Sequence, residues 1–575
     1  MAKMVHPWVN RVSILGLFLS LGNASAVYAP SASTKNGTYL GKTNVHYNQD
    51  EFLGIPYAQP PVGDLRFRAP ASLNESWSDE RNATEYSPIC VGYGSDSNFY
   101  ESSEDCLTIN IVRPAGVPSE PLPVLVWLYG GGFYEGGTVD PRYNLSRLVQ
   151  KSVEANKPII GVSLNYRLSA FGFLWSEEVK ANGSANNGLR DQRLALHWLQ
   201  DNVAAFGGDP DKVTLFGESA GAIAIGRHLT AYGGRDDGLF RAVIMESGGP
   251  LERWPYATPD PDAYSEELYT NLTTSTGCAA NATATASPLE CLRSLPFEKL
   301  NAALNITDTW ISGTGLGPWV AVMDGDFLQD YQSTQIAEGR FVQVPVLYGT
   351  NTDEGTAIGP AGINTDAEFR AAIAEGGPDN DTIAMVEVLY PNVPGIGIPA
   401  AHALTAEEEA TYGSQWKRVA AFFGDMVEHM PRRTLVSACA RANVTAYSYR
   451  FNIVPAGVSA VIGATHYQEV AWVFNNIDGA GYTTNPFNAS LVDRDAYVGV
   501  STLMSRMWAS FATDLDPNHH GLTGYPVWPT YTLEDEGIGA NFVFDANVTS
   551  FVEKDDYRVP GMAYIASKAR EQWKF

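Results

Sequence analysis

The stretch that decides the fold is Val213-Thr-Leu-Phe-Gly-Glu-Ser-Ala-Gly221, followed by Ala222-Ile-Ala-Ile-Gly-Arg-His-Leu229. The β-favouring residues before Gly217 predict a buried strand, and the small apolar residues after Ser219 predict a helix. Glycines on both sides of the serine suit a sharp turn, in which larger side chains would collide with the strand and the helix. The turn would lift Ser219 above the sheet, at a helix N-terminus whose N–H groups stabilise negative charge. Because G-x-S-x-G also occurs by chance, a catalytic interpretation needs a base, an acid and further N–H donors.

A second apolar strand, Pro123-Val-Leu-Val-Trp-Leu128, runs directly into Tyr129-Gly-Gly-Gly-Phe133. Successive apolar residues are typical of a strand that is buried on both faces. The three glycines allow backbone N–H groups to approach a ligand closely, so they are the expected source of further donors. A flexible hairpin is the alternative, but the aromatic residues that follow the glycines argue against it.

Further buried strands are predicted at Pro158–Tyr166, Ala242–Gly248 and Val344–Gly349, with an amphipathic helix at Asn187–Asp201. This alternation predicts a three-layer α/β fold with a mainly parallel sheet between helices. Ligands then bind at the carboxyl ends of the strands, where Ser219 and the glycine run both lie. The remaining predictions are helices and loops over 260–345, mainly helix over 365–440, a strand at 445–452, and helices at 469–474, 496–511 and 555–575.

Residues 1–26 have the form of a secretory signal, with Lys3 and Arg11, an apolar run at Val12–Leu21 and a small-residue cleavage site at Ala24-Ser-Ala26. A membrane anchor is the alternative, but the apolar run is too short to span a bilayer. No linker or repeat divides the remainder, so 27–575 is predicted to be one domain. The formal net charge of −26 disfavours nucleic acid and anionic membranes as partners.

Sequons and cysteines also indicate secretion. N-glycosylation sequons occur at Asn36, Asn74, Asn82, Asn144, Asn182, Asn271, Asn281, Asn305, Asn380, Asn443, Asn488 and Asn547. Five cysteines favour disulfides in such a chain. Local pairs, Cys90 with Cys106 and Cys278 with Cys291, would leave Cys439 over, although spacing alone does not fix connectivity. We see no zinc-ligand spacing and no dinucleotide-binding glycine motif, so neither a metal nor an organic cofactor is expected.

A nucleophilic serine needs a neighbouring base. His466 is the preferred candidate, because it ends the small-residue turn Ile462-Gly-Ala-Thr-His466 late in the chain, where Ser…acid…His order expects the base. The acid would follow the strand at Val344–Gly349, and spacing does not separate Asp353 from Glu354. The other histidines weighed for this role, which we expect to be structural, are His197, His228, His519 and His520.

Together these motifs resemble the type-B carboxylesterase/lipase family, which includes fungal lipases and cholinesterases. Phe216-Gly-Glu-Ser-Ala-Gly-Ala222 resembles the family's serine signature, and Glu104-Asp-Cys-Leu-Thr-Ile-Asn110 resembles its second signature. The resemblance covers nearly the whole chain after the signal. Other segments that match in the family's order are Tyr129–Phe133, Asn165–Arg167, Gly188–Leu194, Asp353–Gly355, Gly463–His466 and Asp516–Asn518.

The resemblance implies an α/β-hydrolase fold, in which a central, mostly parallel, twisted sheet is flanked by helices on both faces. It implies that Ser219 is the nucleophile, Glu354 rather than Asp353 the acid, and His466 the base. The residues it implies for the oxyanion hole are Gly131, Gly132 and Ala220. It further implies the disulfides Cys90–Cys106 and Cys278–Cys291 and the structural ion pairs Arg66–Glu104 and Arg167–Asp191.

The expected function is that of a secreted serine carboxylesterase acting through an acyl-enzyme on small, short- to medium-chain esters. Interfacial lipases of the family carry a long amphipathic lid, whereas only fifteen mostly polar residues lie between Cys90 and Cys106. The alternatives are a lipase or sterol esterase, acyl transfer to an acceptor other than water, and, least expected, a binding protein without catalysis. The natural ester and the oligomeric state stay open. Phe133, Trp254 and Trp319 are the aromatic residues that could line the substrate pocket.

Overall fold

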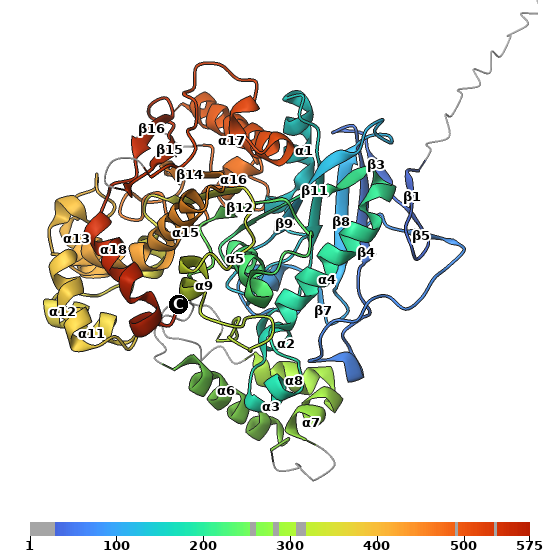
Figure 1. The fold of residues 1–575 in the computed structure, drawn as a ribbon, viewed down its shortest axis with the longest axis horizontal. Coiled ribbons are helices and arrows are strands. Elements are labelled where there is room, and N and C mark those ends of the chain that lie inside the picture. The colour runs from blue at the N-terminus through green and yellow to red at the C-terminus, as the bar shows by residue number, and fades with distance from the viewer. Residues whose placement is uncertain (1–28, 253–259, 280–286, 306–317, 489–492, 534–536) are drawn as a thin grey trace, which may run out of the picture.

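The computed structural model describes residues 29–252, 260–279, 287–305, 318–488, 493–533 and 537–575. An eleven-stranded sheet runs through it in the order β16-β15-β14-β13-β12-β11-β9-β10-β8-β4-β3 (Figure 1). Its strands are β3 (Lys42–Asn44), β4 (Gln49–Pro56), β8 (Thr108–Pro114), β9 (Leu122–Leu128), β10 (Ile160–Leu164), β11 (Gly208–Glu218), β12 (Ala242–Glu246), β13 (Val346–Asn351), β14 (Ala446–Phe451), β15 (Ala540–Phe544) and β16 (Phe551–Lys554). The seven neighbouring strands β15, β14, β13, β12, β11, β9 and β10 are parallel to one another. β16 at one edge and β8, β4 and β3 at the other pair antiparallel with their neighbours.

Helices flank this sheet on both faces (Figure 1). On one face α1 contacts β8 and β10 and α17 contacts β9, while α4 and α5 cover β11 from the other. The helices are α1 (Leu145–Glu154), α2 (Ser169–Phe173), α3 (Glu177–Ala181), α4 (Asn187–Asn202), α5 (Ala220–Gly234), α6 (Pro261–Thr276), α7 (Pro288–Ser294), α8 (Phe297–Leu304), α9 (Gln332–Ala337), α10 (Gly355–Ile358), α11 (Asp366–Ala374), α12 (Asn380–Leu389), α13 (Ala406–Tyr412), α14 (Trp416–Gly424), α15 (Met430–Arg441), α16 (Val470–Val473), α17 (Arg494–Asp514) and α18 (Val559–Lys568). Small strands β1 (Ser31–Ser33), β2 (Thr38–Leu40), β5 (Glu80–Asn82), β6 (Ile89–Cys90) and β7 (Ser102–Ser103) lie outside the main sheet.

The predicted α/β-hydrolase architecture is confirmed, and so are the central strands. Strands β9 and β10 are buried along almost their whole length, as their apolar runs require. The sequence analysis missed β15 and β16, which extend the sheet beyond β14. Residues 1–26, which carry the predicted signal, lie outside the described part of the chain. Within the described ranges, no helix combines the length and the apolar character needed to cross a membrane.

The pairing register of the sheet decides where the loops meet. In β11 and β9, Phe216 lies opposite Trp127 and Gly217 opposite Leu128, and Glu218 lies opposite Glu246 of β12. The glycine run after β9 and the turn after β11 therefore leave the sheet side by side. Strand β13, which ends beside β12, brings the segment that begins at Thr352 to the same edge.

Two disulfides and the two expected ion pairs link segments outside the strands of the main sheet. Disulfides join Cys90 to Cys106 and Cys278 to Cys291, and Cys439 is a buried free thiol. The ion pairs implied by the resemblance are formed: Arg66 Nε lies 2.5 Å from Glu104 Oε1, and Arg167 Nη2 lies 2.6 Å from Asp191 Oδ1.

Candidate active site

Ser219 occupies the turn between β11 and α5 with φ 52° and ψ −125°. Residues other than glycine rarely adopt such a positive φ. The flanking glycines are required by crowding. A Cβ on Gly221 would lie 2.0 Å from the carbonyl oxygen of Leu128, and one on Gly217 would lie 2.7 Å from the same atom. The strain at Ser219 is therefore held in place by main chain on both sides, and the serine side chain is presented at the start of α5.

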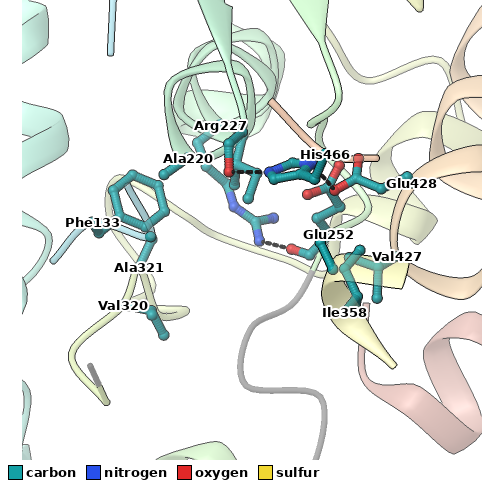
Figure 2. A pocket seen from close by; sticks show the side chains of 14 residues that line it. Phe133, Ala220, Arg227, Glu252, Val320, Ala321, Ile358, Val427, Glu428 and His466 are labelled. Carbon is teal, nitrogen blue, oxygen red and sulfur yellow. Dashed lines mark hydrogen bonds and ion pairs between the residues drawn. The ribbon is translucent and has the colours of Figure 1, made fainter. Parts of the chain in front are cut away.

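His466 and Glu354 complete a hydrogen-bonded line that starts at this serine. His466 Nε2 lies 2.9 Å from Ser219 Oγ, and His466 Nδ1 lies 2.8 Å from Glu354 Oε2. Figure 2 shows the imidazole of His466 at the wall of a pocket that Ser219 also lines. An imidazole held in this way can accept a proton from the hydroxyl at one nitrogen while donating to the carboxylate at the other.

The carboxyl group of Glu354 is itself fixed by two donors. Glu354 Oε1 accepts from the backbone N–H of Asn351 at 2.6 Å and from the hydroxyl of Ser247 at 2.5 Å. Asp353, the alternative that spacing left open, turns the other way and accepts from the N–H of Ala464 at 2.9 Å. Of the two neighbouring carboxylates, the structure brings Glu354 to the imidazole.

Other buried carboxyl groups surround the imidazole. Glu218 Oε1 lies 3.3 Å from His466 Nε2, and Glu428 Oε1 lies 3.7 Å from His466 Nδ1. Burial opposes the charged imidazolium, but the carboxylates of Glu218 and Glu354 outweigh this effect and raise the pKa of His466. Burial likewise raises the pKa of Glu218, and it raises that of Glu469 to about 7. An imidazolium formed at this position is therefore electrostatically stabilised.

The predicted oxyanion donors lie at the same place. Gly132 and Ala220 line the pocket together with Ser219, and Gly131 precedes them in a tight turn with φ 88°. A Cβ on Gly131 would lie 2.4 Å from the carbonyl oxygen of Glu135, so only glycine fits this turn. The amide of Ala220 is the first of α5, where the helix dipole favours negative charge.

The pocket itself has a volume of about 120 Å³. Of the aromatic residues expected to line it, Phe133 does so, whereas Trp319 lines a separate surface pocket with Leu268 and Leu304. Trp254 lies outside the described residues. The sequence analysis missed three charged residues that line the pocket, Arg227, Glu252 and Glu428, since none belongs to a recognisable motif.

The histidines judged structural occupy other environments. His228 is fully buried on α5, its Nε2 lies 2.9 Å from Gln192 Oε1, and burial lowers its pKa to about 3. His519 lies beside Asp514 at the surface. Glu354, Glu428 and His466 each place one ligand-type atom within 4.8 Å of the others. Because His466 Nδ1 and Glu354 are already hydrogen-bonded to each other, this group is part of the site above.

Comparison with known proteins shows which family the chain belongs to. The family model described as "Carboxylesterase family" matches residues 28–553. "Lipase 5" of Diutina rugosa is 34% identical over 584 residues, covering 95% of this chain and 97% of the relative. "Secreted lipase 1" of Botryotinia fuckeliana is 32% identical and covers 84% of each chain. The crystal structure of Aspergillus niger EstA matches with a TM-score of 0.79 at 28% identity, covering 95% of this chain and 99% of that one.

Proposed function

This chain belongs to the carboxylesterase family and is a carboxylic ester hydrolase, and on that premise we propose that it acts through an acyl-enzyme on Ser219. The observation that carries the proposal is the line of two hydrogen bonds from Ser219 Oγ through His466 to Glu354. No other described serine hydroxyl is hydrogen-bonded to a histidine in this arrangement.

In the proposed reaction, Ser219 Oγ attacks the ester carbonyl carbon while His466 Nε2 takes the hydroxyl proton. Glu354 keeps the other proton on Nδ1 and stabilises the imidazolium. The tetrahedral intermediate collapses as the C–O bond to the alcohol breaks and His466 returns its proton to that oxygen. Water then attacks the acyl-enzyme with the same base, which releases the carboxylic acid and restores Ser219.

We assign the oxyanion hole to the N–H groups of Gly131, Gly132 and Ala220. The close approach of the glycine turn to the start of α5 supports this assignment, as does the position of Gly132 and Ala220 on the pocket wall. Preorganised N–H donors of this kind typically contribute a factor of 10² to 10³ in turnover each.

We propose small esters with short to medium acyl chains as the substrates. The Cys90–Cys106 loop is tied to the loop after β9, which argues against a mobile lid. Arg142 binds Asp96 of this loop at 2.5 Å, and Glu135 Oε2 accepts from the N–H of Asp96 at 2.6 Å. The N–H of Tyr93 also donates to the carbonyl of Tyr134 at 3.1 Å.

A lipase is the second candidate, because curated relatives carry that name. The two are separated by measuring rates for p-nitrophenyl butyrate, for a sparingly soluble short-chain triglyceride (tributyrin) below and above its solubility limit, and for an emulsified long-chain triglyceride. An esterase saturates with the soluble ester and shows no jump in rate when the interface forms. A jump of tenfold or more at the interface would favour the lipase.

We further propose that the chain is secreted after removal of residues 1–26 and carries N-glycans. The name of the secreted relative supports secretion. Asn36 and Asn144 are half-buried, and Asn281 lies outside the described residues. The exposed sequon asparagines are Asn74, Asn82, Asn182, Asn271, Asn305, Asn380, Asn443, Asn488 and Asn547. Intact-mass analysis of the secreted protein before and after deglycosylation tests both statements.

The central test is covalent labelling of the nucleophile. A fluorophosphonate probe should label the wild-type protein once, at Ser219, and pre-steady-state hydrolysis of p-nitrophenyl acetate should release one burst of nitrophenol per molecule. Ser219→Ala should abolish both signals, whereas Ser414→Ala, at an exposed serine, should keep them. Labelling that persists in Ser219→Ala would refute the assignment.

A further inference from the structure

Two glutamates face each other inside the pocket that contains Ser219. Glu252 and Glu428 are 3% and 2% exposed, and both line the pocket beside His466 (Figure 2). Glu252 follows β12, and Glu428 lies in a single π-helical turn, Asp425–His429, between α14 and α15. Each carboxyl group affects the titration of the other, and burial raises the pKa of both, which favours a single proton held between them.

This pair has more acceptor capacity than the described residues satisfy. Glu252 Oε1 and Glu428 Oε2 are buried and have no hydrogen-bond partner among the described residues. His466 Nδ1, which lies 3.7 Å from Glu428, already donates to Glu354. A buried acceptor without a donor is unfavourable and uncommon, so these lone pairs are suited to a partner that enters the pocket.

The neighbouring arginine does not supply this partner. Arg227 lines the same pocket, but its guanidinium donates to the carbonyl oxygens of Pro250 at 2.8 Å and Glu252 at 2.5 Å. Its third contact is the side-chain oxygen of Gln332. The hydrogen bonds found for the guanidinium all go to neutral oxygens, and none goes to either carboxyl group.

Apolar side chains form a large part of the pocket wall around the pair. They are Ile223, Val320, Ala321, Ile358 and Val427, together with Phe133. A small number of polar groups in a largely apolar pocket is the pattern by which binding sites fix the orientation and identity of a ligand.

We propose that Glu252 and Glu428 form a specificity subsite that accepts a hydrogen bond from a hydroxyl or ammonium group of the ester substrate. This proposal rests on the function assigned above to Ser219. Two carboxyl groups in contact cannot both ionise readily, and burial raises the pKa of each, so the pair retains its shared proton. The remaining lone pairs can accept hydrogen bonds from the substrate. They favour a substrate that carries a donor group and disfavour one that carries a carboxylate, whereas an alkyl group forms no hydrogen bond with them.

A purely structural role for the pair makes a different prediction. If Glu428 only positioned His466, its loss would slow all esters by a similar factor, because every substrate uses the same base. A subsite instead changes the ratio of kcat/KM between two esters that differ only in the donor. This ratio is independent of how much of the enzyme is active.

The test uses p-nitrophenyl esters matched in shape. The short pair is 3-hydroxybutanoate and 3-methylbutanoate, and the longer pair is trans-4-hydroxy- and trans-4-methylcyclohexanecarboxylate. Analogues with an ammonium group at the same positions show whether the subsite prefers ammonium or hydroxyl. Analogues with a carboxylate there test whether the subsite excludes an anion. Acetates of trans-4-hydroxy- and trans-4-methylcyclohexanol place the same groups on the alcohol side. In at least one pair we expect the donor-bearing ester to have a kcat/KM about tenfold higher or more, because a site built for a hydrogen bond rejects the analogue that lacks it.

The double variant Glu252→Met/Glu428→Met removes both carboxyl groups and keeps a similar side-chain volume. Proteins often tolerate the replacement of buried ionic groups by apolar residues of similar size. It should bring the ratio to one or below, and either single Met variant serves if the double variant does not fold. Glu246→Gln is the control, since Glu246 is a buried neighbouring carboxyl that accepts from Trp508 Nε1 at 2.7 Å and does not line the pocket. It should keep the wild-type ratio.

Two results would overturn the inference. One is a wild-type ratio near or below one in every matched pair, and the other is a preference for the donor that persists in the Met variants. Loss of hydrolysis of all esters, without labelling of Ser219, would instead contradict the proposed function. The two failures are therefore distinguishable.

Discussion

Replacing Glu354 by Gln should disable the base by trapping the wrong tautomer of His466. Glu354 Oε1 accepts from the Asn351 N–H and the Ser247 hydroxyl, so the carbonyl oxygen of a glutamine must take that position. The amide NH₂ is then left facing His466 Nδ1, at the place where Oε2 lies 2.8 Å away. Nδ1 must become the acceptor, which moves the proton to Nε2.

This exchange has a large expected cost. With the proton on Nε2, the imidazole donates to Ser219 Oγ and cannot accept the proton that the attack releases. The equivalent loss of tautomer control in a serine triad lowers kcat by about 10⁴, which corresponds to about 5.4 kcal/mol of transition-state stabilisation. We therefore expect kcat/KM of Glu354→Gln to fall by about 10³ to 10⁴, with the melting temperature almost unchanged because both donors to Oε1 stay satisfied.

Asp353→Asn is the matched control, because it removes the neighbouring carboxylate and leaves an oxygen for the Ala464 N–H. Burial raises the pKa of Asp353 to about 6, so at pH 8 this carboxyl is still ionised and the control also removes a charge. We expect less than a tenfold loss in kcat/KM for p-nitrophenyl butyrate at pH 8. Glu354→Gln retaining more than a tenth of wild-type activity, or Asp353→Asn losing more than Glu354→Gln, would refute the tautomer argument.

Three further predictions concern pH and stability. Activity requires neutral imidazole, so kcat/KM should rise with pH through a pKa for His466 above its ordinary 6.5. Glu218→Gln removes a carboxylate that favours imidazolium and should move this rise in kcat/KM to lower pH. A rise at the same pH as in the wild type would show that Glu218 is uncharged there. Gly221→Ala would put a Cβ 2.0 Å from the carbonyl oxygen of Leu128 and should destabilise the fold by about 3 kcal/mol or more in urea unfolding, whereas a change below about 1 kcal/mol would mean that the turn can relax. Asp191→Asn leaves a buried arginine without its countercharge and should cost about 3 to 5 kcal/mol in the same assay, a loss that a surface ion pair would not produce.

The central sheet could be predicted because its strands carry their own signal. β9, β10 and the second half of β11, from Val213 onward, are buried on both faces of the sheet, so most of their residues are apolar. β15 and β16 lack this signal: β15 begins with Ala540-Asn541, and β16 alternates half-buried with exposed residues at the sheet edge. Their strand conformation depends on pairing with β14 and with each other, which a local pattern does not reveal.

Only the site residues that belong to sequence motifs could be predicted. The G-x-S-x-G turn locates Ser219 because sterics restrict which residues fit there, and the chain order then indicates His466. The choice between Asp353 and Glu354 depends on which way each side chain leaves one turn, and that is set by the backbone N–H groups of Ala464 and Asn351. Only the family resemblance could decide it in advance.

The carboxyl groups around His466 lay beyond sequence reasoning for a further reason. Glu218 adjoins the serine, but Glu252 and Glu428 reach the pocket from a loop after β12 and from a π-helical turn, and an isolated glutamate is normally a surface residue. Burying such groups costs stability unless they are paired or have a role. Glu354 is hydrogen-bonded to His466, whereas Glu252 Oε1 and Glu428 Oε2 have no hydrogen-bond partner among the described residues. Two buried acceptors that the described residues leave unsatisfied, in the pocket that contains Ser219, have the arrangement expected if the substrate of the proposed reaction supplies the missing hydrogen bond.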